Sequence, residues 1–255
     1  MCISMETEIV EAAVWLEEKG LNQGTTGNVS LRWSKTLDVT GTQIDLNRDR
    51  PLQELEIERD IENREDVVTG GKNRIKNRKQ FLITPSGIPY RRLTSDMIVA
   101  MDLDDPDGLW QGEHKPSSEW RFHRAILNDR PEINAVIHCH SQFATALAVN
   151  RVEIPAFHYM VAAFGGNEIR CAPYARFGTN LLSDYAVAAL KNRMGCLLAN
   201  HGMIAIGKTL EQACWYAQQL ETLSAQFWHA QLFGSLCLLT DEQMAEARNA
   251  MQNYF

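Results

Sequence analysis

The sequence lacks most features that mark secreted, membrane-spanning or nucleic-acid-binding proteins. Its six cysteines are spread along 255 residues without a CxxC pair, which favours reduced thiols in the cytoplasm over a disulfide framework. No apolar run approaches the roughly 18 residues of a membrane-spanning helix. The formal net charge of −7 gives no general reason to expect nucleic-acid binding. Acidic residues within the first twenty argue against a signal peptide. These absences predict a soluble, cytoplasmic globular protein.

The regular patterns that are present mix short strands with helices. Residues 5–19 have helical periodicity that Gly20 ends, and apolar residues alternate over 29–33 as in a strand. Capping boxes begin the last two predicted helices, Thr209 with Gln212 and Thr240 with Gln243. We expect further strands in "FLITPSG", "INAVIHCH" and "GCLLANHGMIAIG", and further helices in "PSSEWRFHRAIL", which begins with capping serines, and in "SQFATALAVN". Without a strict βαβ order, this mixture indicates a layered α/β architecture.

One segment, 34–80, breaks the regular patterning. An acidic part, "LQELEIERDIENRED", is followed by a basic part, "GKNRIKNRKQ", and only a short helix around Leu52–Ile61 is indicated. We expect a charged, solvated and partly disordered insertion between two strands, within a single domain that spans residues 1–255. A nucleic-acid-binding or partner-binding role for Lys72–Lys79 is the alternative to a solvated charge run.

The stretch "AVIHCH" offers the first candidate chemistry. Side chains alternate faces along a strand, so His138 and His140 project together while Cys139 points to the opposite face. Two imidazoles at this spacing can converge on one metal ion, and the alternation argues against Cys139 as a further ligand. A redox role for Cys139 is weak, because no resolving cysteine lies nearby in the sequence. A strand with two merely structural histidines is the alternative.

A third ligand must come from elsewhere in the chain. His201 lies at a strand end before Gly202, where the backbone can turn sharply. His114 lies in a polar loop and His123 in an amphipathic helix, so both are less attractive, whereas His158 and His229 stay open. Three histidines with one open position form a catalytic rather than a structural zinc site.

Near such a site, "KPSSEW" places two hydroxyls and a carboxylate at a helix start. The free N–H groups and positive end of a helix at Ser117 and Ser118 suit an anion such as phosphate. Glu119 can be a helix-start acid favoured by the dipole, or beside zinc a ligand or general base. The turns "GTTGNVS" and "TPSG" could cradle phosphate, although each is more often a plain turn, and neither matches a Walker or dinucleotide motif.

Six segments in order resemble the class II, zinc-dependent aldolase and adducin-head family, closest to its L-fuculose-phosphate aldolase branch. These segments are "GLNQGTTGNVSLR", "LITPSGIPY", "PSSEWRFH", "AVIHCH", "IPAFHYMVAAFGGNEIRCAPYARFG" and "NHGMIAIG". Each is weakly specific alone, but together they cover nearly everything outside 34–80, where family members usually have a short turn.

The resemblance implies roles for individual residues. It implies zinc ligation by His138, His140 and His201, with Glu119 as a further ligand and as the acid/base at the substrate's C3. It implies a proton-donating role for Tyr159 from a neighbouring subunit and a role for Tyr254 in closing the site. Phosphate binding would fall to Asn28, Ser86, Gly87, Ser117 and Ser118.

The family fold is a three-layer α/β/α domain with a mostly antiparallel sheet, assembled as a C4 homotetramer. The implied reaction is reversible cleavage of a ketose 1-phosphate to dihydroxyacetone phosphate and an aldehyde. L-fuculose 1-phosphate is the first candidate substrate, and its aldehyde product would be L-lactaldehyde. A ketose-phosphate 4-epimerase, which typically carries Asp at the position of Glu119, and a methylthioribulose-1-phosphate dehydratase are alternatives within the family. A non-catalytic adducin-like module is an alternative from another class, against which the intact histidine set counts.

Overall fold

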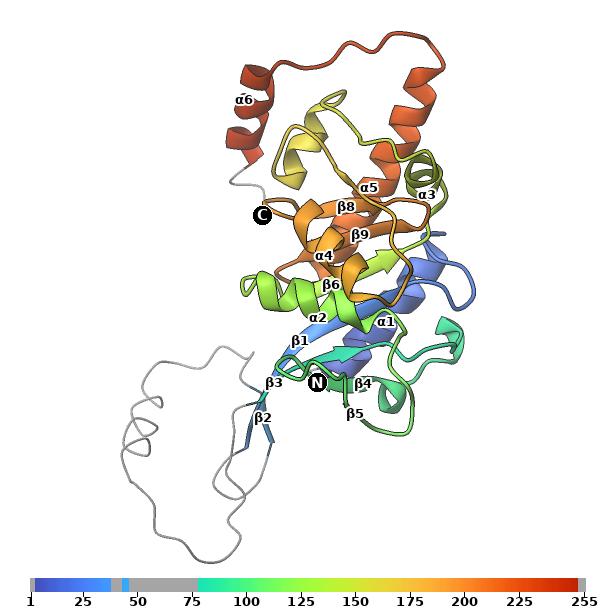
Figure 1. The fold of residues 1–255 in the computed structure, drawn as a ribbon, viewed down its shortest axis with the longest axis vertical. Coiled ribbons are helices and arrows are strands. Elements are labelled where there is room, and N and C mark those ends of the chain that lie inside the picture. The colour runs from blue at the N-terminus through green and yellow to red at the C-terminus, as the bar shows by residue number, and fades with distance from the viewer. Residues whose placement is uncertain (1–2, 38–42, 46–77, 252–255) are drawn as a thin grey trace, which may run out of the picture.

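The computed structural model describes residues 3–37, 43–45 and 78–251 of the chain (Figure 1). Most of the predicted insertion at 34–80 therefore lies outside the described residues, as do the short helix expected around Leu52–Ile61, the basic run at 72–77 and Tyr254. At the two edges of that segment, strand continues: β1 runs on to Leu37 and β3 begins at Arg78.

A single mixed sheet forms the centre of the described chain. Its strands lie in the order β5-β4-β3-β1-β6-β9-β8-β7, with β2 beside β1. Within the described ranges, only β7 and β8 pair in parallel, so the sheet is mostly antiparallel, as the family resemblance implied. The strands are β1 (Asn28–Leu37), β2 (Gln43–Asp45), β3 (Arg78–Ile83), β4 (Val99–Asp102), β5 (Trp110–Gln111), β6 (Ala135–Cys139), β7 (Cys171–Ala172), β8 (Gly195–Leu198) and β9 (Gly202–Gly207).

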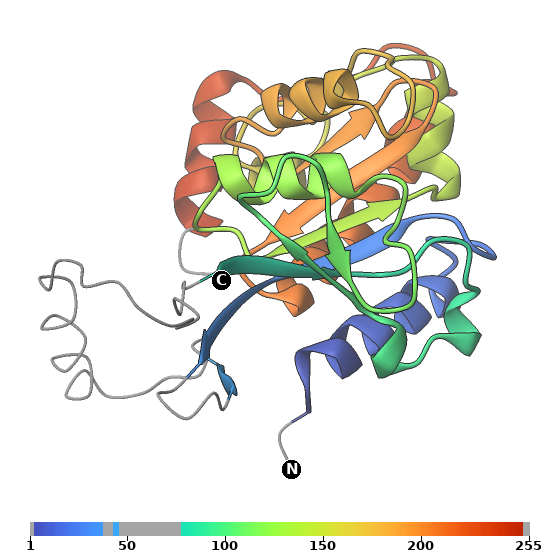
Figure 2. The same ribbon diagram turned by 60° about the horizontal axis from the view of Figure 1, so that its bottom comes forward.

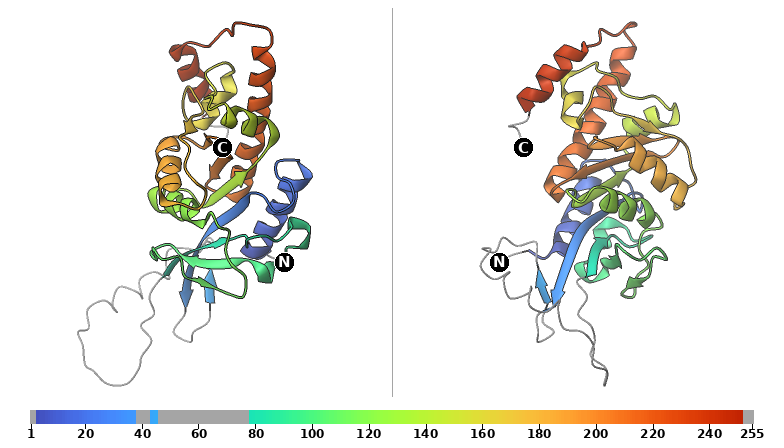
Figure 3. Two further views of the ribbon diagram at one scale, coloured as in Figure 1. Left: turned by 45° about the vertical axis from the view of Figure 1, so that its right-hand side comes forward. Right: turned by 60° about the vertical axis from the view of Figure 1, so that its left-hand side comes forward.

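Helices cover both faces of this sheet and complete three layers (Figure 2). α1 (Met5–Glu18), α3 (Gln142–Val149) and α5 (Leu210–Gln231) pack on one face, and α2 (Trp120–Asp129) and α4 (Asn180–Ala189) pack on the other. α6 (Asp241–Met251) returns beside the 3₁₀ helix η4 (Tyr159–Phe164), as Figure 3 shows. Two short 3₁₀ turns, η2 (Tyr90–Arg92) and η3 (Ser95–Met97), lie next to α1. The described helices include none that combines the length and apolarity needed to cross a lipid bilayer.

The apolar core is divided by the sheet, and strand alternation decides which residues enter each half. Val29 of β1 and Ile137 of β6 join the cluster under α1, α3 and α5. Val136 of β6 and Ile204 of β9 join the cluster under α2 and α4. All five residues of β6 are buried because helices cover both of its faces. The strand that carries the histidines is therefore a central strand held on both sides.

Helix ends follow the sequence signals, with one correction. Gly20, with φ +71°, ends α1, and the backbone N–H groups of Gln212 and Gln243 donate to the hydroxyls of Thr209 and Thr240 as predicted. The Gln243 side chain completes its box by accepting from Thr240 N, whereas the Gln212 side chain accepts from Lys208 N instead of Thr209 N. The expected serine caps of α2 are wrong. That helix begins at Trp120, with Glu119 at the N-cap position, so both serines lie in the preceding turn.

Candidate metal centre

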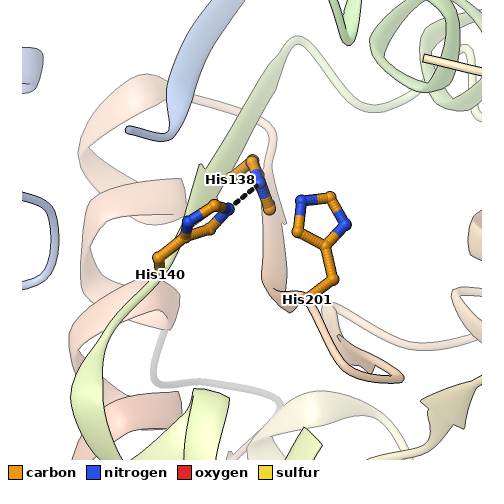
Figure 4. Close-up of side chains that lie close together, drawn as sticks. All are labelled: His138, His140 and His201. Atoms are coloured by element: carbon orange, nitrogen blue, oxygen red, sulfur yellow. Dashed lines mark hydrogen bonds between the residues drawn. The ribbon is translucent and has the colours of Figure 1, made fainter. Parts of the chain in front are cut away.

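His138, His140 and His201 meet at the carboxyl end of β6 (Figure 4). One ring nitrogen from each lies within 4.8 Å of the other two, and the Nε2 atoms of His138 and His140 are 2.9 Å apart. The three rings face one another edge to face, with centroids 4.7–5.0 Å apart. Strand alternation predicted the first two neighbours, and the fold adds His201.

His201 reaches this cluster because the turn between β8 and β9 approaches β6 very closely. Asn200 makes the turn with φ 57°, a left-handed conformation that asparagine tolerates. Gly202 does not adopt positive φ, so our expectation that it supplies the sharp turn is wrong. A Cβ atom there would lie 2.4 Å from the Cys139 carbonyl oxygen and 2.9 Å from the His140 ring. Gly202 is needed for that close approach.

The backbone holds one ring nitrogen of His138, and the other nitrogen faces the cluster. Its Nδ1 lies 2.8 Å from the Met203 carbonyl oxygen, which can only accept, so Nδ1 carries the proton. Its Nε2 atom then points toward His140 and Glu119. A second-shell carbonyl bond of this kind is the usual support of a metal-ligating histidine.

Glu119 closes the fourth side of the cluster. Its Oε2 atom lies 3.2 Å from His138 Nε2, and its Oε1 atom lies 3.2 Å from His201 Nε2. Burial raises the pKa of the Glu119 carboxyl, but the nearby imidazoles of His138 and His201 outweigh burial and lower that pKa far below its usual range. In return, Glu119 raises the pKa of His138 against the effect of burial.

The arrangement fits a divalent cation. Three imidazole nitrogens and a carboxylate are the ligand types of catalytic zinc. Oε1 of Glu119 is buried without a conventional hydrogen bond, and burial together with the neighbouring histidines lowers the pKa of His140 to about 4, which favours the neutral, ligating form. Converging lone pairs and one buried anion repel each other unless protons or a cation lie between them. The described residues thus provide a possible three-histidine metal site.

Cys139 lies away from this site. It is fully buried in the cluster under α1, α3 and α5, on the opposite face of β6 from His138. Burial raises the pKa of its thiol well above the ordinary value, which keeps it protonated. The predicted exclusion of Cys139 from the ligand set agrees with this geometry.

A single side chain, Asn22, ties the glycine-rich turn to the metal strand. Its amide oxygen accepts from His140 N at 3.1 Å, and its amide nitrogen donates to the His138 carbonyl at 3.4 Å. Gly27, with φ +73°, passes so close that an added Cβ would lie 2.3 Å from Asn22 Nδ2. The turn is therefore joined directly to the backbone of the two histidines.

A pocket of ≈ 350 Å³ opens above the cluster. One part of its wall is polar and rich in hydroxyl groups, and another, formed by Tyr174, Ala175 and Phe177, is apolar. His140, His201 and Glu119 lie in the wall as well. The polar wall consists of Thr25, Thr26, Gly27, Asn28, Ser86, Gly87, Ser117, Ser118 and Asn200.

The structure brings most of the predicted site residues together. All five residues expected to bind phosphate line the pocket with Glu119, although they come from three separate segments of the chain. Tyr159 does not line it: the side chain begins η4 and is 53% exposed. Sequence reasoning missed Asn22, which clamps the histidine backbone, and undervalued His123, which is fully buried behind the site.

Comparison with known proteins agrees with this geometry. The family model described as the Class II Aldolase and Adducin N-terminal domain matches residues 7–228. The 5-methylthioribulose-1-phosphate/5-deoxyribulose-1-phosphate aldolase of Rhodospirillum rubrum is 44% identical over 99% of this chain and 93% of its own length. The L-fuculose phosphate aldolase of Escherichia coli K12 is 37% identical over 97% of this chain and 94% of its own length.

A solved structure extends the agreement to three dimensions. An L-fuculose 1-phosphate aldolase structure superimposes with a TM-score of 0.75 at 30% identity, covering 99% of this chain and 98% of the other. The resemblance, the fold class and the enzyme class predicted from sequence are thereby confirmed. The chain belongs to the class II aldolase and adducin N-terminal domain family and is an enzyme of the class II aldolase type.

Proposed function

We propose that the protein reversibly cleaves a ketose 1-phosphate to dihydroxyacetone phosphate and an aldehyde, with zinc as its metal. One observation carries the proposal: the three histidines and Glu119 lie in the wall of a pocket whose other residues offer hydroxyl groups at one part and an apolar surface at another. When bound, zinc supplies a Lewis acid that stabilises negative charge on the substrate as the C3–C4 bond breaks.

The polar wall suits the phosphate group. Among the residues that line it there is no lysine or arginine, so the anion would be held by hydroxyls, backbone N–H groups and the positive end of α2. Ser117 is well prepared: its Oγ accepts from Asn28 Nδ2 at 2.9 Å and from Glu119 N at 3.3 Å. Its own proton is then free to donate into the pocket. Asn28 would act partly by orienting Ser117, and Ser86, Gly87 and Ser118 would bind the phosphate beside it.

Two residues would move protons. Glu119 would carry the proton that is exchanged at C3 when the bond breaks or forms, since its carboxylate lies among the histidines in the pocket wall. Tyr159 would take the proton from the C4 hydroxyl as the aldehyde forms, and return it in the synthetic direction. Because Tyr159 is exposed and lies outside its own chain's pocket, we infer that it serves the site of a neighbouring subunit in a C4 homotetramer.

Mixing two inactive variants tests this sharing of sites. In a tetramer with shared sites, Glu119→Gln and Tyr159→Phe subunits combined after reversible dissociation would regain activity, because some sites then hold both native residues. No recovery, or a monomer in solution, would contradict the shared site. We also propose that Tyr254 helps to close the site, as the family resemblance implies.

The apolar part of the pocket wall indicates which chemical group lies at the end of the substrate opposite the phosphate. Tyr174, Ala175 and Phe177 would face a methyl or methylthio end better than a hydroxyl. L-fuculose, 5-deoxyribulose and 5-methylthioribulose, named for the relatives' substrates, all end in such a group. We infer a deoxy- or methylthio-ketose 1-phosphate. L-fuculose 1-phosphate, yielding L-lactaldehyde, was the prediction from sequence, and the relative at 44% identity makes 5-methylthioribulose 1-phosphate an equal candidate.

A substrate panel tests the proposal and separates it from the family alternatives. Purified protein, loaded with zinc and verified by metal analysis, is offered L-fuculose, 5-methylthioribulose, 5-deoxyribulose and L-ribulose phosphates. Release of dihydroxyacetone phosphate supports the aldolase. Epimerisation of the ribulose phosphate, loss of water from the methylthio substrate, or no turnover at all would replace it with the epimerase, the dehydratase or the adducin-like module, respectively.

We place the reaction in the cytoplasm, where the described cysteines, all free, would stay reduced.

A further inference from the structure

A line of buried polar side chains runs behind the metal site, between β1 and α2. It passes from Ser30 through His123 and Asn28 to Glu119, and none of the four is more than 7% exposed. His123 comes from α2, whose neighbouring residues Phe122 and Ile126 are buried core. A fully buried histidine among such residues is costly unless both ring nitrogens are satisfied.

Both nitrogens are satisfied, and the partners determine which one carries the proton. Nε2 of His123 makes a short hydrogen bond with the side-chain oxygen of Asn28, which can only accept, so Nε2 donates. Nδ1 lies 2.7 Å from the Ser30 hydroxyl and accepts from it. The ring is therefore neutral, in the Nε2–H form. Burial and the nearby His138 lower the pKa of His123 to about 3, which keeps it neutral at physiological pH.

The direction of the Asn28 amide depends on this donor. With its oxygen held by His123, Asn28 must turn its NH₂ group to the other side, where it donates to Glu119 Oε2 at 3.0 Å and to Ser117 Oγ at 2.9 Å. A flipped amide would place an oxygen against the Glu119 carboxylate, which repels it. The Asn28 amide is thus held on its oxygen side by His123 and on its nitrogen side by Glu119 and Ser117.

We propose that His123 is a positioning residue that fixes the amide of Asn28 and, through it, the carboxylate of Glu119 and the hydroxyl of Ser117. The expected change in kcat rests on the proposed function, whereas the hydrogen bonds between His123, Asn28 and Glu119 do not depend on it. His123 touches neither the pocket nor the predicted ligand atoms in any described hydrogen bond. Its effect on catalysis would pass entirely through Asn28.

Two substitutions distinguish positioning from simple filling of the core. His123→Gln keeps an N–H that can reach the Asn28 oxygen, whereas His123→Phe keeps a ring that can stack on Phe122 but has no donor. We expect the phenylalanine variant to lose about 10- to 100-fold in kcat with a small change in KM, the usual effect of removing a supporting hydrogen bond. The glutamine variant should recover most of that loss. His229→Gln, on the exposed end of α5, is the matched control.

A measurement that needs no activity accompanies the kinetics. Side-chain nitrogen NMR of the zinc-loaded wild type, with His123 assigned through the His123→Gln spectrum, should show the neutral Nε2–H form near neutral pH. An Nδ1–H form or a charged ring would overturn the inference, even if His123→Phe fails to fold. Equal kcat in the phenylalanine and glutamine variants would also overturn it. A wild type that turns over no ketose phosphate would refute the proposed function instead and leave the NMR test standing.

Discussion

The carboxylate of Glu221, on α5, caps the helix that follows His140. Its Oε2 atom accepts from Ser141 Oγ at 2.7 Å and from Ala144 N at 2.8 Å, and its Oε1 atom accepts from Phe143 N at 2.8 Å. Ser141 is the N-cap residue of α3, yet its own side chain makes no capping bond. Glu221 therefore satisfies the free N–H groups of α3 from a distant part of the chain.

Glu221→Gln replaces one acceptor oxygen by an NH₂ group, which then faces an N–H or O–H donor of α3 or Ser141 and cannot bond to it. Hydrogen bonds to charged groups contribute about 1.5–3 kcal/mol, and loss of a helix cap costs about 0.5–2 kcal/mol. Because Glu221 is only partly buried, we take about 2 kcal/mol as the loss in the free energy of unfolding. For a domain of this size, that lowers Tm by about 4–8 °C.

Thermal unfolding followed by circular dichroism, with metal removed from all samples, measures the change. Glu246→Gln on exposed helix α6 is the control and should leave Tm nearly unchanged. If both variants unfold at the same temperature, the carboxylate does not stabilise the start of α3, and the reasoning fails. We also expect weaker zinc binding in Glu221→Gln alone, because α3 begins directly after His140.

Three further predictions concern individual residues. Gly27→Ala should lose stability and zinc affinity, because its Cβ would displace Asn22, whereas Gly24→Ala has a similar φ of +64° but open space, so zinc titrations and melting curves of the pair isolate the clash. As the pH drops from about 6.5 towards 3, the free energy of unfolding of the wild type should fall by up to about 1.4 kcal/mol per pH unit more than that of His123→Gln. The reason is that His123 binds a proton in the unfolded chain but, with a pKa of about 3, stays neutral in the folded one. Urea titrations at several pH values measure both free energies, and an equal dependence on pH in the two proteins would disprove this. Cys139→Ala should keep one zinc per chain by metal analysis, and loss of the metal would make the thiol a ligand after all.

Strand alternation was sufficient to predict half of the candidate metal site. It placed His138 and His140 on one face of β6 and Cys139 on the other without knowledge of any partner strand. His201 and Glu119 could not be placed by spacing, because they come from the β8–β9 turn and from the start of α2. Sequence reasoning could name both only as candidates among others, and the family resemblance joined them to the first two.

The residues behind the site were missed for a different physical reason. His123 was taken as an ordinary residue of an amphipathic helix because its partners lie on β1 and α2 gives no local sign of them. A signal was present in β1 itself: Asn28 and Ser30 alternate with Val29 and Leu31, so two polar residues share one buried face. Our reading of that strand considered only its apolar side. The close approach of Gly202 to Cys139 is likewise a tertiary contact that no local pattern predicts.

The central claim is that Glu119 and a zinc ion held by three histidines together break a carbon–carbon bond. The most direct measurement is dihydroxyacetone phosphate release from L-fuculose 1-phosphate and 5-methylthioribulose 1-phosphate, by wild type before chelation, after chelation and after zinc is restored. Glu119→Gln and Glu113→Gln, an exposed neighbour, are assayed beside it. We predict that activity disappears on chelation, returns with zinc, falls by about 10²-fold or more in Glu119→Gln and stays unchanged in Glu113→Gln. Full activity without metal, or in Glu119→Gln, would contradict the account.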